Sequence, residues 1–215
     1  MTARFASVVL DVDSTLAAIE GIDWLAARRG PLVAAQVAAL TARAMGGELL
    51  IEQVYAQRLD AIRPTVADVA ALADAYRAAV AAGASETLAE LRAAGVVIQL
   101  VSGGLREAIL PMAAALGIAD DAVHAVAVRF DARGDYAGVD PGSPLTTQHG
   151  KVDVVRRLGL RAPVLAVGDG ATDAAMRPVV AAFAVYTGFV RREQVIRAAE
   201  HEVASFAALA ALILG

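Results

Sequence analysis

The sequence predicts an α/β fold with a doubly wound, mainly parallel sheet, an inserted helical segment and a β-hairpin. Residues 17–76 carry helical patterns and no strand pattern, and residues 123–139 alternate like the two arms of a hairpin. Elsewhere, apolar runs typical of buried parallel strands alternate with helical patterns, which indicates a doubly wound sheet. These runs lie at residues 5–10, 96–101, 164–167 and 181–186.

The composition of the whole chain argues against several classes of protein. Its 215 residues, 58% of them hydrophobic, are enough for one domain or for one domain with an inserted lobe. The net charge of -4 and the lack of a basic stripe argue against nucleic acid as a partner. With no cysteine, the chain has neither disulfides nor thiolate metal sites, which is compatible with a cytoplasmic enzyme.

Neither end of the sequence predicts a membrane segment. Asp11 interrupts the first apolar run, so the N-terminus lacks a basic-then-apolar signal segment. The apolar run at residues 206–214 is too short to span a bilayer and is expected to pack as a closing helix. We therefore expect a cytoplasmic protein with no membrane partner.

The first predicted strand ends in two aspartates that are two residues apart, Asp11 and Asp13. Alternate side chains of a strand share a face, so both carboxylates are expected to point the same way where the strand ends. Two like charges this close need a cation, and hard oxygen ligands suit Mg²⁺. A solvated acidic turn is the alternative, since aspartate and serine are common in turns.

The helical patterns that follow the first strand include residues 22–28 and 49–62. They predict a cap formed by residues 17–76 and an α/β core formed by residues 1–16 and 77–215. A cap over the strand ends would exclude water from a site there and would hold determinants of substrate choice. Helices that simply add to the core fit the same periodicity.

The second predicted strand ends at Ser102-Gly103-Gly104, before a helical pattern that begins at Leu105. Glycine lets the backbone approach a ligand closely, and N–H groups at a helix start favour an anion. The segment therefore predicts a phosphate site, with an ordinary strand-to-helix turn as the alternative. The helix before this strand is expected to start at Ser85 and to stop at Gly95.

The third predicted strand ends at Gly168-Asp169-Gly170, and Asp173 follows at helical spacing. Ligands of open α/β sheets bind at the carboxyl ends of the strands. Asp169 is therefore expected to complete a magnesium site with Asp11, while Asp173 orients a metal-bound water or a loop.

Lys151 is the only lysine among 19 basic residues. A compact ammonium neutralises a phosphate or a crowded carboxylate without the wide fork of a guanidinium. Its presence in an arginine-rich chain indicates a functional position, with chance retention as the alternative.

Four segments of this chain occur in the order and context of the four motifs of the haloacid dehalogenase superfamily. They are Asp11-Val-Asp13-Ser14-Thr15, Ser102-Gly103-Gly104, Lys151 and Gly168-Asp169-Gly170-Ala-Thr172-Asp173. Within that superfamily, the chain most closely resembles the phosphoserine phosphatases. The narrower match includes Glu20-Gly21-Ile22-Asp23, Ala44-Met45-Gly46-Gly47, Arg58 and Gly134-Asp-Tyr-Ala-Gly138. The resemblance runs over nearly the full length and implies a Rossmann-like core with a helical cap.

The chain departs from this family at four positions, none of which removes a catalytic group. Ala82 stands where proline is common, Val126 where relatives often carry a polar residue, Val152 where glycine is frequent, and Thr172 where some members have asparagine. His149, two residues before Lys151, offers a competing alignment, but histidine supplies no permanent positive charge.

The resemblance implies hydrolysis of a phosphomonoester through an aspartyl-phosphate. Asp11 would be the nucleophile, and Asp13 would act first as general acid and then as general base. Three groups would bind the phosphoryl oxygens: the Ser102 side chain, the Gly103 N–H and Lys151.

The resemblance also implies Mg²⁺ as the cofactor. Its ligands would be the Asp11 side chain, the Asp13 backbone carbonyl and Asp169, with Asp173 in support.

Substrate choice is expected to reside in the cap. Glu20 would pair with a substrate ammonium, Arg58 would bind a carboxylate through two parallel hydrogen bonds, and Met45 would line the apolar side of the pocket. Without the family context, a solvated glutamate, a surface arginine and a core methionine are equally fair interpretations. The expected substrate is L-phosphoserine, which would give L-serine, and the expected protein is a monomer or a homodimer.

Three other functions stay open. The substrate could be another small phosphomonoester, or the phosphoryl group could pass to an alcohol such as homoserine instead of water. A phosphoacceptor signalling module is the third, because receiver domains also combine a strand-end aspartate with magnesium and a lysine. The acid/base group Asp13 beside the acceptor, and the cap-sized insertion, argue against that module.

Overall fold

A computed structural model describes residues 3–45 and 49–215, apart from the side chains of Ala42, Ala44 and Met45. Within these residues, six parallel strands form one sheet in the order β3-β2-β1-β6-β7-β8. The strands are β1 (Ser7–Leu10), β2 (Val97–Leu105), β3 (Val123–Val126), β6 (Val164–Gly168), β7 (Ala182–Tyr186) and β8 (His201–Val203). The prediction of a doubly wound α/β fold is confirmed.

The central strands are apolar because both faces of the sheet are covered. Every residue of β1, β6 and β7 is buried, as expected for parallel strands between two helical layers. Leu10 at the end of β1 pairs with Leu100 of β2 on one side and with Val167 of β6 on the other. The carboxyl ends of these three strands therefore lie side by side, where the strand order reverses and ligands bind.

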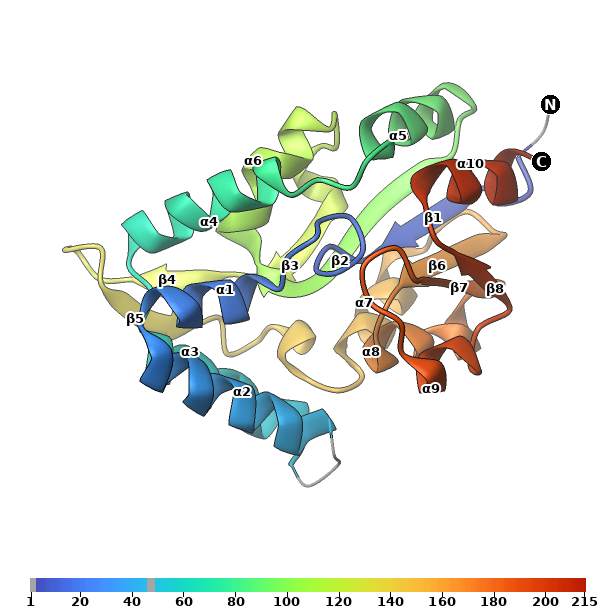
Figure 1. Cartoon of the computed structure of the whole chain (residues 1–215). Helices are drawn as coiled ribbons and strands as arrows, with labels where there is room; N and C mark the ends of the chain where they lie inside the picture. Colours follow the sequence, from blue (N-terminus) through green and yellow to red (C-terminus); the bar gives the residue numbers. More distant parts are fainter. Residues whose placement is uncertain (1–2, 46–48) are drawn as a thin grey trace.

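Helices cover both faces of the sheet (Figure 1). One face carries α5 (Ala84–Ala93), α6 (Arg106–Ala115) and α10 (Phe206–Leu214), and the other carries α7 (Gly150–Leu158), α8 (Ala171–Ala174) and α9 (Glu193–Ile196). The predicted closing helix at residues 206–214 is confirmed as α10, and the Ser205 hydroxyl caps it by accepting a hydrogen bond from the Ala208 N–H at 3.1 Å. Three short 3₁₀ helices lie in the connections that the structure describes: η1 (Asp120–Ala122), η2 (Pro144–Thr146) and η3 (Arg177–Val179).

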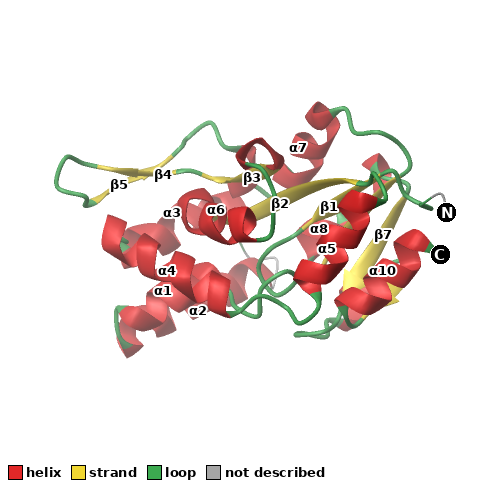
Figure 2. Ribbon diagram, turned by 90° about the horizontal axis from the view of Figure 1, so that it is seen from above, coloured by secondary structure: helices red, strands yellow, loops and turns green. Residues whose placement is uncertain are grey.

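In the described residues, four helices lie between β1 and the core helix α5: α1 (Gly21–Arg28), α2 (Pro31–Met45), α3 (Ile51–Ile62) and α4 (Val66–Ala78). Figure 2 shows them gathered at the end of the molecule that lies away from the two termini. Helix α4 packs against both α1 and the core helix α6. The division into a core of residues 1–16 and 77–215 and a cap of residues 17–76 stays a prediction.

The predicted hairpin at residues 123–139 is confirmed for residues 128–139, but residues 123–126 belong to the main sheet. Strand β3 pairs in parallel with β2, and only β4 (Val128–Phe130) and β5 (Tyr136–Val139) form a separate antiparallel pair. Alternation of side chains does not distinguish an edge strand from a hairpin arm, because both have one covered face.

Two smaller differences concern helix and strand boundaries. Helix α5 begins at Ala84 behind Gly83, whose φ of 75° is left-handed, one residue before the predicted start at Ser85. Strand β8 was not predicted, because its three residues at the sheet edge form no apolar run.

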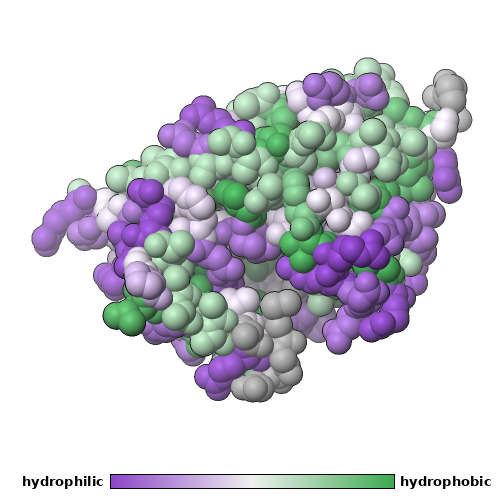
Figure 3. All heavy atoms as spheres, in the orientation of Figure 1, coloured by the Kyte–Doolittle hydropathy of each residue, from purple (hydrophilic) through white to green (hydrophobic). Residues whose placement is uncertain are grey.

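The surface combines apolar and polar areas. Figure 3 shows hydrophilic residues gathered over the turn between β4 and β5 and around α9, while pale green apolar residues are mixed with hydrophilic ones over α4 and α5. None of the helices in the described ranges combines the length and the apolar character that a membrane-spanning helix needs.

Candidate active site

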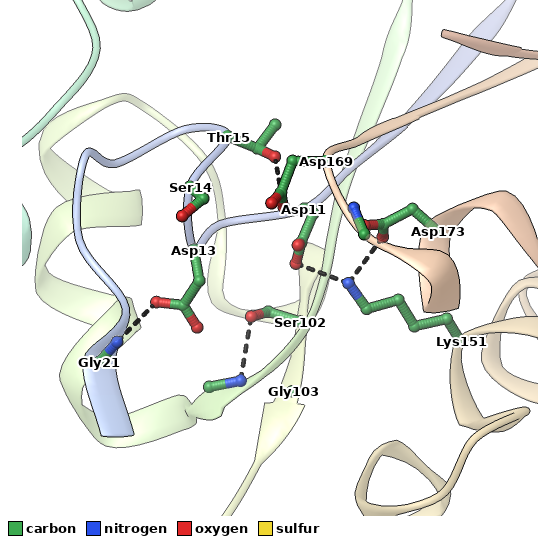
Figure 4. Close-up of polar contacts among 12 residues, drawn as sticks. Asp11, Asp13, Ser14, Thr15, Gly21, Ser102, Gly103, Lys151, Asp169 and Asp173 are labelled. Atoms are coloured by element: carbon green, nitrogen blue, oxygen red, sulfur yellow. Dashed lines mark hydrogen bonds and ion pairs between the residues drawn. The ribbon is translucent and has the colours of Figure 1, made fainter. Parts of the chain in front are cut away.

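Three buried carboxylates lie together at the carboxyl ends of two neighbouring central strands (Figure 4). Asp11 directly follows β1, Asp169 directly follows β6, and Asp173 lies in α8. One oxygen of each lies within 4.8 Å of the others. Because β1 and β6 are adjacent, the sheet itself brings Asp11 and Asp169 together. This set of hard oxygen donors fits a divalent cation such as Mg²⁺.

Lys151 neutralises two of these carboxylates. Its Nζ lies 2.7 Å from Asp11 Oδ1 and 2.7 Å from Asp173 Oδ1. Burial alone would lower the pKa of Lys151, but the two carboxylate charges outweigh burial and raise it, so the side chain stays charged. His149, which offered the competing alignment, is exposed at the start of α7. The lysine therefore supplies the permanent positive charge at this position.

Asp173 connects Lys151 to the end of β6. Its second oxygen, Oδ2, accepts the Gly170 N–H at 3.0 Å. Burial, followed by the charge of Asp11, raises the pKa of Asp173 to about 6, although Lys151 and the Gly170 N–H oppose this shift. The carboxylate is therefore held between a cation and a backbone donor.

Arg192 is a second cation at the carboxylates, and sequence reasoning missed it. Its guanidinium forms an ion pair with the Asp169 carboxylate, contacts the Asp169 carbonyl oxygen at 3.4 Å and lies 3.9 Å from Glu20 Oε1. The residue directly precedes the four-residue helix α9. In a chain with 18 arginines, no local signal distinguishes it.

Asp11 and Asp13 have different partners, and the expectation that their carboxylates share a face stays a prediction. Figure 4 shows Asp11 directed at Lys151 and Asp13 directed at Gly21. Strand β1 ends at Leu10, and the chain then turns through Ser14, whose φ is 51°. The alternation of a strand therefore does not extend to these residues.

Two donors hold the Asp13 carboxylate. Asp13 Oδ1 accepts the Tyr76 hydroxyl at 2.6 Å and the Gly21 N–H at 3.0 Å. Burial, then the charges of Glu20 and Asp11, raise the pKa of Asp13 to about 7 against these donors. Burial also raises the pKa of Tyr76 well above its usual value, so its hydroxyl keeps its proton. Tyr76 was not predicted as a site residue, because a tyrosine in a helical pattern is usually interpreted as a residue of the hydrophobic core.

Ser102 and Gly103 lie at the irregular end of β2, not at a helix start. The register with β3 shifts between Val101 and Leu105, and α6 begins only at Arg106. The buried Ser102 hydroxyl oxygen accepts the Gly104 N–H at 3.0 Å. The Tyr55 hydroxyl of α3 donates to the Gly103 carbonyl at 2.7 Å, which links α3 to this loop.

The predicted substrate-binding residues lie on the helical side of the site. Glu20 directly precedes α1, and its Oε1 accepts the Ser14 hydroxyl at 2.7 Å. Arg58 of α3 reaches α1, with Nη2 3.2 Å from Asp23 Oδ1. The Arg58 Nε is buried and has no hydrogen-bond partner in the described part of the chain. Met45 and its neighbours up to Gly47 lie outside the residues or side chains described, so that expectation stays a prediction.

Comparisons with known proteins show the family to which this chain belongs. The model of the haloacid dehalogenase-like hydrolases matches residues 5–177. The phosphoserine phosphatase of Mus musculus is 36% identical over 206 residues, which cover 94% of this chain and 91% of the mouse protein. The chloroplastic phosphoserine phosphatase of Arabidopsis thaliana is also 36% identical, over 94% of this chain and 70% of its own length.

Solved structures show the same relation. A phosphoserine phosphohydrolase-like protein from Francisella tularensis superposes with a TM-score of 0.86 at 25% identity, covering 97% of this chain and 99% of that one. A phosphoserine phosphatase with an analogue of the phospho-aspartyl intermediate superposes with a TM-score of 0.76 at 26% identity, covering 93% of both chains. The chain therefore belongs to the haloacid dehalogenase-like hydrolases, in the phosphoserine phosphatase family, and it is a phosphatase.

Proposed function

We propose that this phosphatase hydrolyses L-phosphoserine to L-serine and phosphate through a phosphorylated Asp11. The convergence of Asp11, Asp169, Asp173 and Lys151 at the carboxyl ends of β1 and β6 is the observation that carries this proposal. The site combines a nucleophile with positive charge for a phosphate, which is the combination that phosphoryl transfer needs.

In the first step, an Asp11 carboxylate oxygen attacks phosphorus and the bond to the serine oxygen breaks. Asp13 gives its proton to that oxygen, so serine leaves as the neutral alcohol. A pKa of about 7 keeps a useful fraction of Asp13 protonated at neutral pH. Asp11 then carries the phosphoryl group.

In the second step, Asp13, now ionised, takes a proton from a water that attacks the same phosphorus. The bond between Asp11 and phosphorus breaks, which releases phosphate and restores the Asp11 carboxylate. The two displacements replace one difficult hydrolysis, and Asp13 returns to its protonated state.

The groups around Asp11 would stabilise the phosphoryl oxygens. Lys151, the Ser102 hydroxyl and the Gly103 N–H would donate to them, and positive charge in a buried site is effective there. The Asp11 and Asp169 side chains and the Asp13 carbonyl would hold Mg²⁺, with Asp173 in support. When bound, this ion would neutralise phosphate charge that the carboxylates would otherwise repel.

The substrate class rests on the helical side of the site. The buried Arg58 Nε has no partner among the described residues, so it is a donor that a substrate carboxylate would satisfy. Glu20 would accept the substrate ammonium, and Met45 would line the apolar wall of the pocket. The relatives in mouse and Arabidopsis are named for phosphoserine, which supports the same class.

The test is magnesium-dependent phosphate release from L-phosphoserine, D-phosphoserine, phosphothreonine, sugar phosphates and p-nitrophenyl phosphate. We expect a strong preference for L-phosphoserine and the same phosphate yield with or without homoserine. The Asp11→Asn variant, purified in the same way, controls for contaminating phosphatases. Activity on the other esters with little on L-phosphoserine would overturn the substrate, and formation of phosphohomoserine would overturn hydrolysis in favour of transfer.

A further inference from the structure

The Tyr76 side chain is fully buried and reaches from α4 to the side chain of Asp13. Its hydroxyl donates to Asp13 Oδ1 at 2.6 Å, and the Gly21 N–H at the start of α1 donates to the same oxygen at 3.0 Å. Both donors therefore act on one oxygen of the carboxyl group.

Two neighbouring glycines leave room for the tyrosine hydroxyl, Gly21 more critically than Gly104. A Cβ atom at position 21 would lie 2.2 Å from the Tyr76 oxygen. At position 104, at the end of β2, a Cβ would lie 3.1 Å from the Tyr76 oxygen and 3.1 Å from Asp13 Oδ2. The place of the hydroxyl is thus shaped by α1, α4 and β2 together.

Two donors on Oδ1 decide where the carboxyl group carries its own proton. An oxygen that already accepts two hydrogen bonds is a poor place for a third hydrogen, whereas a tyrosine hydroxyl stays protonated through the neutral range. The proton of a neutral Asp13 is therefore directed to Oδ2. That oxygen lies beside Gly104, the last residue of the Ser102-Gly103-Gly104 segment.

We propose that Tyr76 is a positioning residue that holds Asp13 with Oδ2 as its proton-donating oxygen. This inference rests on the proposed role of Asp13 as general acid. When Asp11 attacks phosphorus and the serine oxygen departs, that oxygen receives the proton from Asp13 Oδ2. A carboxyl group free to rotate would spend only part of its time in that orientation, and the transfer would be slower.

The leaving group provides the test. Serine needs a proton as it departs, whereas p-nitrophenolate is stable without one, so only the serine ester depends on Asp13 in the first step. The Tyr76→Phe variant removes the hydroxyl and keeps the ring. We expect its kcat/KM for L-phosphoserine to fall about ten- to a hundredfold, and its kcat/KM for p-nitrophenyl phosphate to stay within about twofold.

Two controls separate positioning from packing. Tyr186→Phe makes the same chemical change at a buried tyrosine that packs against Phe189 and Phe206, and its ratio of the two kcat/KM values should equal that of the wild type. This ratio does not depend on how much of a preparation is folded. If Tyr76→Phe does not fold, Gly104→Ala crowds the same hydroxyl and should shift the ratio in the same direction.

A double-mutant cycle tests whether Tyr76 acts through Asp13. Asp13→Asn should lower kcat/KM for L-phosphoserine, and adding Tyr76→Phe should lower it no further. Equal losses on both esters, an unchanged ratio, or additive losses in the double variant would overturn the inference. If the wild type hydrolyses only other alkyl phosphates, the substrate proposal fails, and the best of those esters replaces L-phosphoserine in this test.

Discussion

Lys151 shows how a buried charge is tolerated at the scale of one residue. Its side chain is only 8% exposed, and its Nζ lies 2.7 Å from a carboxylate oxygen of Asp11 and 2.7 Å from one of Asp173. Removing one charged side chain from such a buried cluster leaves another charge without a partner. The resulting loss of stability is larger than the net stability that the intact cluster contributes. The position therefore needs a cation.

We expect both Lys151→Arg and Lys151→Met to lose at least about 100-fold in kcat, because the first misplaces the charge and the second removes it. Lys151→Met should also unfold more easily by about 3–5 kcal/mol, since Asp11 and Asp173 lose their cation. Steady-state kinetics and urea unfolding measure these effects. Arg156→Met removes an exposed charge from the same helix α7 and serves as the control. Wild-type kcat in Lys151→Arg would show that the compact ammonium is not required.

Arg58 is the residue that tests the proposed amino-acid specificity most directly. We expect Arg58→Ala to lower kcat/KM for L-phosphoserine by about 100-fold, because a charged hydrogen-bonded pair with the carboxylate is lost. Activity on p-nitrophenyl phosphate, which has no carboxylate, should change little. Arg77→Ala, which removes an exposed arginine of α4, is the control for a general effect of charge. Equal losses on both esters would exclude a carboxylate clamp.

The sequence was sufficient to predict the site residues that follow strand ends. It was insufficient to predict the residues that reach the site from other elements. Asp11 and Asp169 could be predicted, because acidic residues after apolar strands meet at one edge of a parallel sheet. Tyr76 and Arg192 could not, because one comes from the buried side of a helix and the other from a loop of an arginine-rich chain. The direction of Asp13 depends on a turn that local alternation does not describe.

At the scale of elements, the start of α4 combines a capping box with an ion pair. The Asp68 carboxylate accepts the Thr65 N–H at 2.9 Å and the Thr65 hydroxyl at 2.8 Å, and it forms an ion pair with Arg29 of the segment after α1. Burial alone would raise the pKa of Asp68, but the Thr65 hydrogen bonds and the Arg29 charge outweigh burial and lower it. The folded state therefore prefers the ionised form.

Because the pKa of Asp68 is lower in the folded chain than in the unfolded chain, where it is near 4, the ionised carboxylate stabilises the fold fully above about pH 4. This stabilisation is lost as the pH falls through the pKa of Asp68 in the folded chain. We expect Asp68→Asn to reduce the free energy of unfolding by about 1 kcal/mol at pH 7. The difference from wild type should shrink as the pH falls below about 4. Urea unfolding from pH 7 to pH 3 measures it.

Asp74→Asn is the matched control on the same helix, because Asp74 is exposed and pairs only with Arg77 among its described neighbours. Its effect should stay within about 0.5 kcal/mol at every pH. An effect of Asp68→Asn that stays the same from pH 7 to pH 3 would show that its charge does not stabilise α4.

Elements with long apolar runs could be predicted, and short edge elements could not. Strands β1, β6 and β7 are buried throughout, and their continuous apolar runs indicate this burial in the sequence. The edge strands β3 and β8 are held by tertiary pairing with β2 and β7, which periodicity alone does not contain.

At the scale of the whole molecule, the carboxylate cluster connects distant parts of the chain. Asp11 comes from β1, Asp169 and Asp173 come from β6 and α8, and Lys151 comes from α7. A cation bound there would link segments that are more than a hundred residues apart in sequence, and it would bind the folded chain alone. The expected monomer or homodimer and the expected cytoplasmic location stay predictions.

We expect Mg²⁺ to raise the melting temperature of the wild type by on the order of 5 °C at a concentration about 100-fold above its Kd. Asp169→Asn should lose most of this increase, because one carboxylate ligand becomes a neutral amide. Asp153→Asn, on the exposed side of α7, should keep it. Thermal unfolding with and without Mg²⁺ measures the effect without relying on activity, and an equal increase in Asp169→Asn would place the ion elsewhere.

The central claim is that Asp11 carries the phosphoryl group, and trapping that intermediate tests it most directly. The enzyme is mixed with Mg²⁺ and its best phosphomonoester substrate, quenched in acid within one turnover, and digested for mass spectrometry. We expect the added phosphate on the peptide that contains Asp11, and none on the same peptide of Asp11→Asn. Phosphate on another residue, or phosphate release by Asp11→Asn at the wild-type rate, would contradict the account.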